Sequence, residues 1–305
     1  MTGRPVVVVL GPTASGKSDV AMDHARRHPR TEIVAVDAMQ VYRQMDIGTA
    51  KPTASDRAEV PHHCLDLTGS DSDFTVAEFV ARATASLADI AARGATALLV
   101  AGTGLYLRAV TDPMEIPGQW PEVRRSLEAE ADEVGPEVLH ARLTELDPVA
   151  AARMEPTNTR RVVRALEVVQ GSGRRFSSFG PGLDQYPPVG FAQVGLRWPR
   201  EILARRIEER VVRMVSAGLV SEVESLLSGP GLSRTAAQAL GYKEIVDHLE
   251  GRCSLDETVE TIVRRTRQFA VRQERWFRRD PRVRWVDVEH DPVAEVRPVL
   301  EELSR

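Results

Sequence analysis

The sequence is poor in cysteine, in lysine and in aromatic residues. Its two cysteines, Cys64 and Cys253, lie far apart without CxxC spacing, which supports neither a disulfide scaffold nor a thiolate zinc site. No run approaches the ~18 apolar residues that span a bilayer. The start of the sequence, MTGRPVVVVL, lacks the long apolar segment of a signal peptide. We therefore expect a cytoplasmic protein that does not enter membranes.

Lysine is the scarcest charged residue. Only Lys17, Lys51 and Lys243 occur among 40 basic side chains, and the other 37 are arginines. Each position that keeps a lysine is therefore a place to look for chemistry. With 44 acidic side chains the net charge is −4, and the hydrophobic fraction of 42% across 305 residues is enough for a sizeable core. A disordered chain is excluded.

Short apolar runs bounded by turn residues predict a parallel sheet. Three of them are typical of fully buried strands: Val6–Leu10, Glu32–Val36 and Ala97–Val100. Between the last two, residues 74–92 carry apolar side chains at the three- and four-residue spacing of a helix. Strands that alternate with helices predict an α/β fold in which helices flank a parallel sheet.

The pattern changes between two stretches rich in proline and glycine, 112–121 (DPMEIPGQWP) and 180–190 (GPGLDQYPPVG). The segment between them predicts helices only, at Pro121–Val134, Pro136–Leu146 and Thr159–Gln170. Strand patterns then return at Phe191–Trp198 and Val283–Val288. We therefore predict one domain formed by residues 1–112 and 191–305, interrupted by an all-helical insertion at 113–190.

A complete GxxxxGK[ST] phosphate loop, GPTASGKS, follows the first strand and precedes a helical pattern. Glycines let backbone amides turn towards phosphate oxygens, Lys17 bridges two phosphates, and Ser18 supplies a ligand for Mg²⁺. We expect Mg²⁺ as the cofactor and a diphosphate or a nucleotide such as ATP as the ligand. The predicted binding residues are Gly11, Pro12, Thr13, Ala14, Ser15, Gly16, Lys17 and Ser18.

The acids near this loop indicate what it serves. Many nucleotide hydrolases and kinases hold Mg²⁺ with an Asp at the end of an apolar strand, but the strand at 97–100 runs into Ala101-Gly102-Thr103-Gly104. Asp37 instead ends the strand at 32–36, at the sheet edge where ligands of open α/β sheets bind. Two interpretations of Asp37 stay open: a general base beside the phosphate loop, or a cap for the next turn.

Further motifs follow in order along the chain. They are DAMQVY (37–42), DIGTAKP (46–52), PHH (61–63), GTGLY (102–106), RRVVRALEV (160–168), ALGYKE (239–244) and RRTRQFAVRQ (264–273). Together with the phosphate loop, these segments closely resemble the tRNA dimethylallyltransferases, also called tRNA isopentenyltransferases. The resemblance spans essentially the whole chain. Its departures are small: Ala101 stands where the family usually has Gly, and Ala38 where Ser is common.

The resemblance implies transfer of a dimethylallyl group from dimethylallyl diphosphate to N6 of the adenosine directly 3′ of a tRNA anticodon, position 37 of the tRNA. It implies that Asp37 is the catalytic base, that the phosphate loop cradles the diphosphate, and that Thr103 lines the channel where adenine meets the prenyl donor. Arg206 and Arg210 are further candidates for the diphosphate. The residues expected to contact tRNA are Asp37, Ala38, Met39, Gln40, Thr103, Arg124, Arg160, Arg161 and Arg164.

Charge is unevenly distributed along the chain. Residues 264–284 contain nine arginines and two acids, a local charge of +7 that leaves −11 elsewhere, and residues 160–175 carry +4. Phosphate backbones respond to such local clusters and not to the net charge. An ordinary solvated face with ion pairs stays open for either cluster. We expect a monomer that binds the tRNA anticodon stem-loop.

Three other functions remain to be weighed. A small-molecule or nucleoside kinase is disfavoured by the strand end at 101–104, which has no acid. A non-catalytic, nucleotide-gated RNA-binding protein is disfavoured by Asp37 beside the phosphate loop. A prenyltransferase acting on free adenylate would not need two arginine-rich surfaces. His62 and His63 have no Cys or carboxylate at zinc spacing, and we expect structural roles for them.

Overall fold

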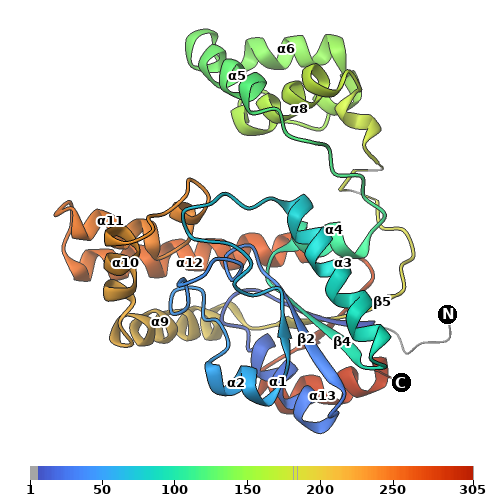
Figure 1. Ribbon diagram of the computed structural model, residues 1–305, viewed down its shortest axis with the longest axis vertical. Coiled ribbons are helices and arrows are strands. Elements are labelled where there is room, and N and C mark those ends of the chain that lie inside the picture. Colours follow the sequence, from blue (N-terminus) through green and yellow to red (C-terminus); the bar gives the residue numbers. More distant parts are fainter. Residues whose placement is uncertain (1–5, 181, 184, 305) are drawn as a thin grey trace. The chain divides into compact units, whose positions relative to one another are not determined.

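The protein is described here by a computed structural model that covers residues 6–180, 182–183 and 185–304. The chain divides into two compact units (Figure 1). The first unit comprises Met1–Thr111 and Pro188–Arg305, and the second comprises Asp112–Pro187. The second unit is therefore inserted into the sequence of the first.

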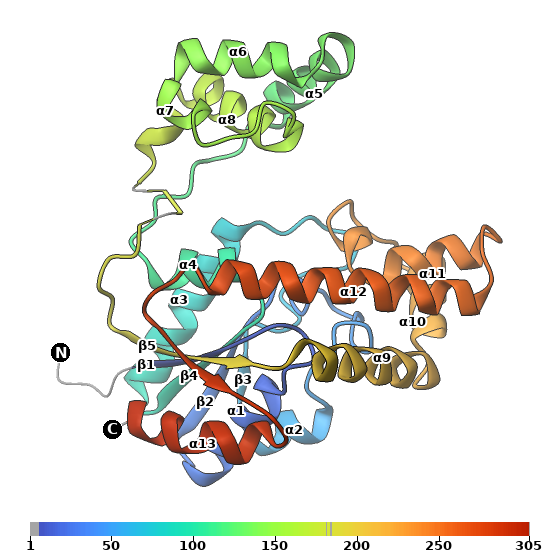
Figure 2. The ribbon, with the colours of Figure 1, turned by 180° about the vertical axis from the view of Figure 1, so that it is seen from behind.

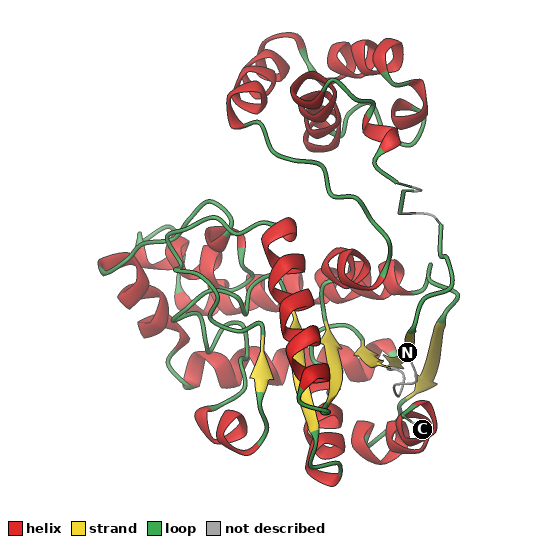
Figure 3. Ribbon diagram, turned by 45° about the vertical axis from the view of Figure 1, so that its right-hand side comes forward, coloured by secondary structure: helices red, strands yellow, loops and turns green. Residues whose placement is uncertain are grey.

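The first unit is built on a six-stranded sheet with the order β3-β2-β4-β1-β5-β6, in which every neighbouring pair is parallel. The strands are β1 (Val6–Leu10), β2 (Thr31–Val36), β3 (His62–His63), β4 (Thr96–Ala101), β5 (Phe191–Arg197) and β6 (Val283–Asp287). The apolar runs are buried because helices lie on both sides of the sheet (Figure 3). The predicted α/β class is confirmed.

The handedness of the connections between strands explains how helices come to cover both faces of the sheet. The chain passes from β1 through α1 (Lys17–Arg27) to β2, and then through α3 (Val76–Ala92) back to β4, which lies between β1 and β2. These two crossovers run in opposite directions along the sheet. Since parallel crossovers are right-handed, α1 and α3 lie on opposite faces. The α13 helix (Pro292–Leu303) packs beside α1 (Figure 1).

The remaining helices of the first unit are α2 (Ala54–Glu59), α4 (Gly104–Thr111), α9 (Arg200–Ser216), α10 (Leu219–Ser228), α11 (Tyr242–Leu249), α12 (Leu255–Phe277) and the short η2 (Ala236–Gln238). Figure 2 shows α12 as a single long helix beside α9. A capping box between Ser254 and Glu257 starts α12. Within the described part of the chain, no helix has both the length and the apolar character needed to cross a bilayer.

The second unit is all-helical and has a core of its own. Its elements are α5 (Pro121–Val134), α6 (Pro136–Leu146), α7 (Pro148–Ala151), α8 (Thr159–Ser172) and the short η1 (Phe176–Ser178). Leucines from three helices form the centre of that core: Leu127, Leu139, Leu143 and Leu166. The buried Asp147 caps α7 and accepts hydrogen bonds from the backbone and side chain of Ser177. These bonds fasten the start of α7 to η1.

Candidate active site

A cavity of about 1100 Å³ opens in the first unit where β1, β2 and β4 end. The phosphate loop follows β1, Asp37 follows β2, and Gly102 and Thr103 follow β4, and all of them line the cavity. Residues of α9 and α12 complete its wall. The carboxyl edge of an open parallel sheet is where such folds bind ligands.

The phosphate loop is tightly folded. Ala14 has a φ of 61° and Gly16 a φ of 88°, both in the left-handed region, which glycine adopts without strain. At Gly11 an added Cβ would lie 2.9 Å from Ser15 Oγ and 3.3 Å from Leu196 O. A side chain at this position would therefore displace the loop from β5.

Side chains from distant parts of the chain fix the backbone of this loop. Arg206 Nε donates to Ala14 O at 2.9 Å, and Trp198 Nε1 donates to Ser15 O at 2.9 Å. The Arg206 guanidinium also lies over the Trp198 ring, 4.4 Å from its centroid. Arg206 thus supports the phosphate loop through a carbonyl while lining the same cavity.

Gln273 joins two sides of the site, and the sequence reasoning missed it. Its Oε1 accepts a hydrogen bond from Thr13 N at 2.9 Å, and its Nε2 donates to Gly102 O at 2.7 Å. Gln273 is buried on α12 beside Ala270 and Phe277. The sequence pattern that could have indicated this role is a glutamine on an otherwise apolar helix face, because a buried amide needs hydrogen-bond partners.

Lys17 lies in the cavity wall with its ammonium group donating to Pro12 O at 3.4 Å. Burial, and secondarily the nearby Arg210, lower the pKa of Lys17 to about 8. Burial likewise lowers the pKa of Arg210. Both cations are thus held in a cavity that disfavours their charge, and an anionic ligand would relieve this cost.

Asp37 uses its two oxygens differently. Its Oδ1 accepts hydrogen bonds from Met39 N at 2.8 Å and Gln40 N at 3.3 Å. A Cβ built on Gly102 would lie 3.2 Å from Asp37 Oδ2 and 3.4 Å from Lys17 Cε. The second oxygen and the Lys17 side chain therefore converge over Gly102. Of the two interpretations of Asp37, the turn cap is present, and it leaves the other oxygen directed into the site.

Thr103 supports the same turn, since its Oγ1 accepts a hydrogen bond from Ala38 N at 3.2 Å. Gln40 Nε2 donates to Thr49 O at 3.0 Å and to Ala50 O at 3.2 Å. The segment 37–40 and Thr103 all line the cavity. The structure thus brings these predicted residues together around the end of β2.

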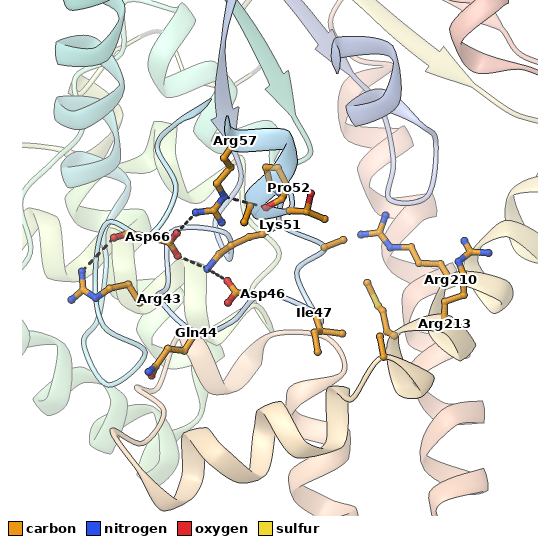
Figure 4. Close-up of a pocket in the computed structure, with 15 residues that line it drawn as sticks. Arg43, Gln44, Asp46, Ile47, Lys51, Pro52, Arg57, Asp66, Arg210 and Arg213 are labelled. Atoms are coloured by element: carbon orange, nitrogen blue, oxygen red, sulfur yellow. Dashed lines mark hydrogen bonds and ion pairs between the residues drawn. The ribbon is translucent and has the colours of Figure 1, made fainter. Parts of the chain in front are cut away.

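Lys51 organises the loop that follows. Its side chain is only 1% exposed, and its Nζ contacts Tyr42 O at 2.5 Å. Figure 4 shows its contacts with Asp46 Oδ1 at 2.7 Å and Asp66 Oδ1 at 2.6 Å. Arg57 binds the other oxygen of Asp66 at 2.6 Å. This network lines a second cavity of about 920 Å³, which shares Lys51, Arg210 and Arg213 with the first.

Glu222 fastens the loop from the other side. Its carboxylate accepts from the consecutive amides of Asp46, Ile47 and Gly48 at 2.7–3.2 Å, and from Tyr242 Oη at 2.6 Å. The motifs GTAKP and GYKE, through Lys51 and Tyr242, thereby both stabilise the loop at residues 46–48. Lys243, the neighbour of Tyr242, is exposed.

The four predicted tRNA-contacting arginines of the second unit fall into two pairs. Arg124 and Arg164 lie 3.0 Å and 2.9 Å from the carboxylate of the buried Glu167. Glu167 also accepts from Trp120 N at 2.8 Å. The other pair, Arg160 and Arg161, is exposed. The first pair is therefore held in place by a buried acid, whereas the second faces solvent.

The arginine-rich segment 264–284 is partly neutralised. Five of its nine arginines form ion pairs with acids: Arg265 with Glu244, Arg267 with Glu208, Arg278 with Glu274, Arg282 with Asp280 and Arg284 with Glu302. Arg272, Arg275 and Arg279 are exposed, and Arg272 lines the active-site cavity. The positive surface is therefore smaller than the sequence count indicates and lies partly at the cavity itself.

The family model described as IPP transferase matches residues 40–280, and the isopentenyl transferase model matches residues 4–66. The chain belongs to the IPP transferase family. Among curated members, the tRNA dimethylallyltransferase of Kineococcus radiotolerans is 50% identical, covering 97% of this chain and 96% of the relative. That of Thermobifida fusca is 48% identical, covering 92% and 89%.

Solved structures of IPP transferase family members agree with this assignment. The full-length tRNA isopentenylpyrophosphate transferase of Bacillus halodurans is 36% identical with a TM-score of 0.69, and the match covers 98% of this chain and 96% of that one. A eukaryotic dimethylallyltransferase, described as acting on tRNA, is 25% identical with a TM-score of 0.76, covering 93% and 74%. The suspected resemblance is confirmed.

Proposed function

We propose that this protein is a tRNA dimethylallyltransferase. It transfers a dimethylallyl group from dimethylallyl diphosphate to N6 of the adenosine 3′-adjacent to the anticodon, position 37 of the tRNA, and forms N6-isopentenyladenosine. Family membership and the names of close relatives support the reaction class. The observation that carries the proposal is the convergence of Asp37 Oδ2 and the Lys17 side chain over Gly102.

The leaving group is diphosphate, so the site must accept negative charge as the carbon–oxygen bond breaks. Lys17 and Arg210 provide positive charge in a setting that keeps water away from it. The phosphate-loop amides that follow Ala14 lie where α1 begins. The start of a helix also favours anions. Because Arg206 and Trp198 hold the loop carbonyls, the amides are arranged before the ligand arrives.

The nucleophile is an exocyclic amine whose lone pair is delocalised into the adenine ring. Removing its proton as the new nitrogen–carbon bond forms assists attack. Asp37 is suited to accept this proton, because Oδ1 is anchored by the amides of Met39 and Gln40 while Oδ2 is directed into the cavity. Thr103 orients the same turn through Ala38 N.

The donor set is compatible with Mg²⁺. Ser18 and Asp37 place a hydroxyl and a carboxylate in the same cavity, and such hard oxygen atoms are the ligands this ion prefers. Ser18 would hold the ion at the start of α1 together with diphosphate oxygens. When bound, Mg²⁺ supplies further neutralisation of the leaving group's charge.

A base stacked in an anticodon loop must leave the stack to reach a cavity of this kind. We propose that the segment from Asp37 to Gln40 and Thr103 receive the extruded adenosine. The insertion domain contributes tRNA contacts through Arg124, Arg160, Arg161 and Arg164. We further propose that the enzyme acts as a monomer in the cytoplasm.

The test is incubation with Mg²⁺ and labelled dimethylallyl diphosphate in the presence of either unmodified tRNA or AMP, with a parallel assay of phosphate transfer from ATP to nucleosides. The expected result is label in tRNA at the adenosine beside the anticodon. Label only in AMP, or phosphate transfer from ATP, would contradict the proposal.

The role of Asp37 is tested with Asp37→Asn, since the amide oxygen can still accept from Met39 N and Gln40 N while the group no longer accepts a proton. We expect turnover to fall by about 10²-fold or more, with tRNA affinity unchanged. A variant that binds tRNA normally and retains wild-type turnover would refute Asp37 as the base.

A further inference from the structure

Two histidines and a glutamate meet at the far end of the helix pair α1 and α13. His24 and His28 are one turn apart at the end of α1, and Glu301 comes from the last turn of α13. The two helices run in the same direction, because a Cβ on Gly16 at the start of α1 would lie 2.7 Å from Pro292 at the start of α13. The cluster therefore lies at the opposite end of the pair from the phosphate loop.

The spacing of this cluster is close to that of a metal site. One ligand atom from each of the three residues lies within 4.8 Å of the others. His28 Nε2 is 3.2 Å from the Glu301 carboxylate, which matches the separation of about 3.3 Å between neighbouring ligands around a tetrahedral ion with bonds near 2.0 Å. The His24 and His28 ring centroids are 4.3 Å apart. Small side-chain rotations would bring all three ligand atoms to bonding distance.

His24 provides an independent indication of a ligand. Its exposed fraction is 5%, and its ring packs against the ring of His28 within the cluster. Burial disfavours the charged imidazolium form of this side chain. The neutral ring is the form that coordinates a metal ion.

We propose that His24, His28 and Glu301 form a binding site for a divalent transition-metal ion of the Zn²⁺ class. Two imidazoles and one carboxylate are a known ligand set for Zn²⁺, with a fourth position left for water. Two histidines at i and i+4 present their rings on one helix face, which is the spacing that such ions use on helices. The site lies apart from the cavity, none of whose lining residues it shares.

The surrounding charges permit this binding. Arg27 Nε lies 3.5 Å from Glu301, but this guanidinium is half-exposed and can turn into solvent. Asp23 and Arg297 neutralise one another across the same helix pair at 3.0 Å. A bound ion would replace the weak contact between Arg27 and Glu301 with coordinate bonds. It would tie the C-terminal helix to the helix that carries the phosphate loop.

The probe is Co²⁺, whose visible absorption reports the coordination geometry, followed by displacement with Zn²⁺. The full chain is titrated up to about 0.1 mM metal, and unfolding is followed by heating with and without Zn²⁺. The variants are His28→Gln and Glu301→Gln, both at partly exposed positions that tolerate an amide. The matched control is His63→Gln, because His63 also contacts a glutamate, Glu32, at 2.6 Å, and the described residues add no third ligand there.

We expect saturable binding at one ion per chain, a visible spectrum typical of four or five ligands, and a higher melting temperature with Zn²⁺. Each of the two ligand variants should weaken binding by about tenfold or more, while His63→Gln should leave it unchanged. No saturable binding to the wild-type chain overturns the proposal. So does binding that survives in either ligand variant or is lost in the control.

Discussion

Diphosphate binding should draw a proton onto Lys17. Burial in the cavity wall, and then repulsion by Arg210, lower the pKa of Lys17 to about 8 in the free protein. Above pH 8 the free protein therefore holds this amine mostly uncharged. A bound diphosphate stabilises the ammonium form and returns the pKa to its usual value of about 10.4 or above. Ligand binding and protonation are thus linked.

The size of the effect follows from these two pKa values. Uptake should be about 0.1 proton per diphosphate at pH 7, about 0.5 at pH 8 and about 0.9 at pH 9. The affinity for diphosphate should fall roughly tenfold between pH 7 and pH 9, or about 1.4 kcal/mol. Since the pKa in the folded state lies below that of the unfolded state, the free protein should also gain stability between about pH 8 and 10.4.

The assay is titration calorimetry of inorganic pyrophosphate with Mg²⁺ in two buffers of different ionisation enthalpy. The ligand's own proton exchange is subtracted from a blank without protein. Lys17→Arg is the control, because a guanidinium does not titrate in this range. Arg210→Gln should raise the pKa of Lys17 and so reduce uptake at pH 8. Equal uptake at pH 8 by wild type and Lys17→Arg would refute the reasoning.

Four further outcomes are expected. Lys51→Met should lower the free energy of unfolding by about 2–4 kcal/mol, because two carboxylates lose their buried partner. The melting temperature should fall by roughly 5–10 °C. Lys243→Met, at an exposed position, should melt like wild type. Gly102→Ala should lower kcat with little change in melting temperature, since its Cβ would crowd Asp37 Oδ2 at 3.2 Å; an unchanged kcat contradicts the site geometry. Gln273→Leu should raise KM for the diphosphate by up to about 30-fold, because Thr13 N and Gly102 O each lose a hydrogen bond worth about 1 kcal/mol; an effect on KM for tRNA alone would contradict that assignment. The tRNA affinity should fall roughly 50- to 150-fold between 50 and 200 mM salt, as expected for about four phosphate contacts, and a salt-independent affinity would exclude such contacts. Arg160 and Arg161 are the exposed arginines of the proposed tRNA-contacting set, and Arg275 and Arg279 are exposed in the arginine-rich segment 264–284.

The strands and most helices follow from local sequence. Val6–Leu10 forms β1 with the predicted bounds, as do the first two helices of the second unit, α5 and α6. Strand order does not follow in the same way. An apolar run shows that a strand is buried on both faces, but it does not show that β4 lies between β1 and β2. The short β3 pairs over two residues only, too few for a periodic pattern to appear.

For the candidate site too, some contacts could be predicted from local sequence and others could not. Lys17 and Asp37 could be predicted to lie near one another, since the phosphate loop that contains Lys17 and the residue Asp37 each follow a strand of one parallel sheet. Gln273 and Glu222 could not, because their partners are 260 and 174–176 residues away along the chain. Ion pairs such as that between Arg267 and Glu208 could not be predicted either. Packing between distant helices sets these contacts, and a single sequence carries no periodic signal for them.

The hydrogen bond between Gln273 and Thr13 has a consequence for synthesis of the chain. During translation the phosphate loop is among the first segments made, whereas α12, which holds its backbone, is among the last. The second unit has its own core, so it can fold on the ribosome while the sheet still lacks β5 and β6. The nascent chain therefore carries the motif for most of its synthesis without the geometry that binds diphosphate, and it acquires that geometry only as synthesis nears completion.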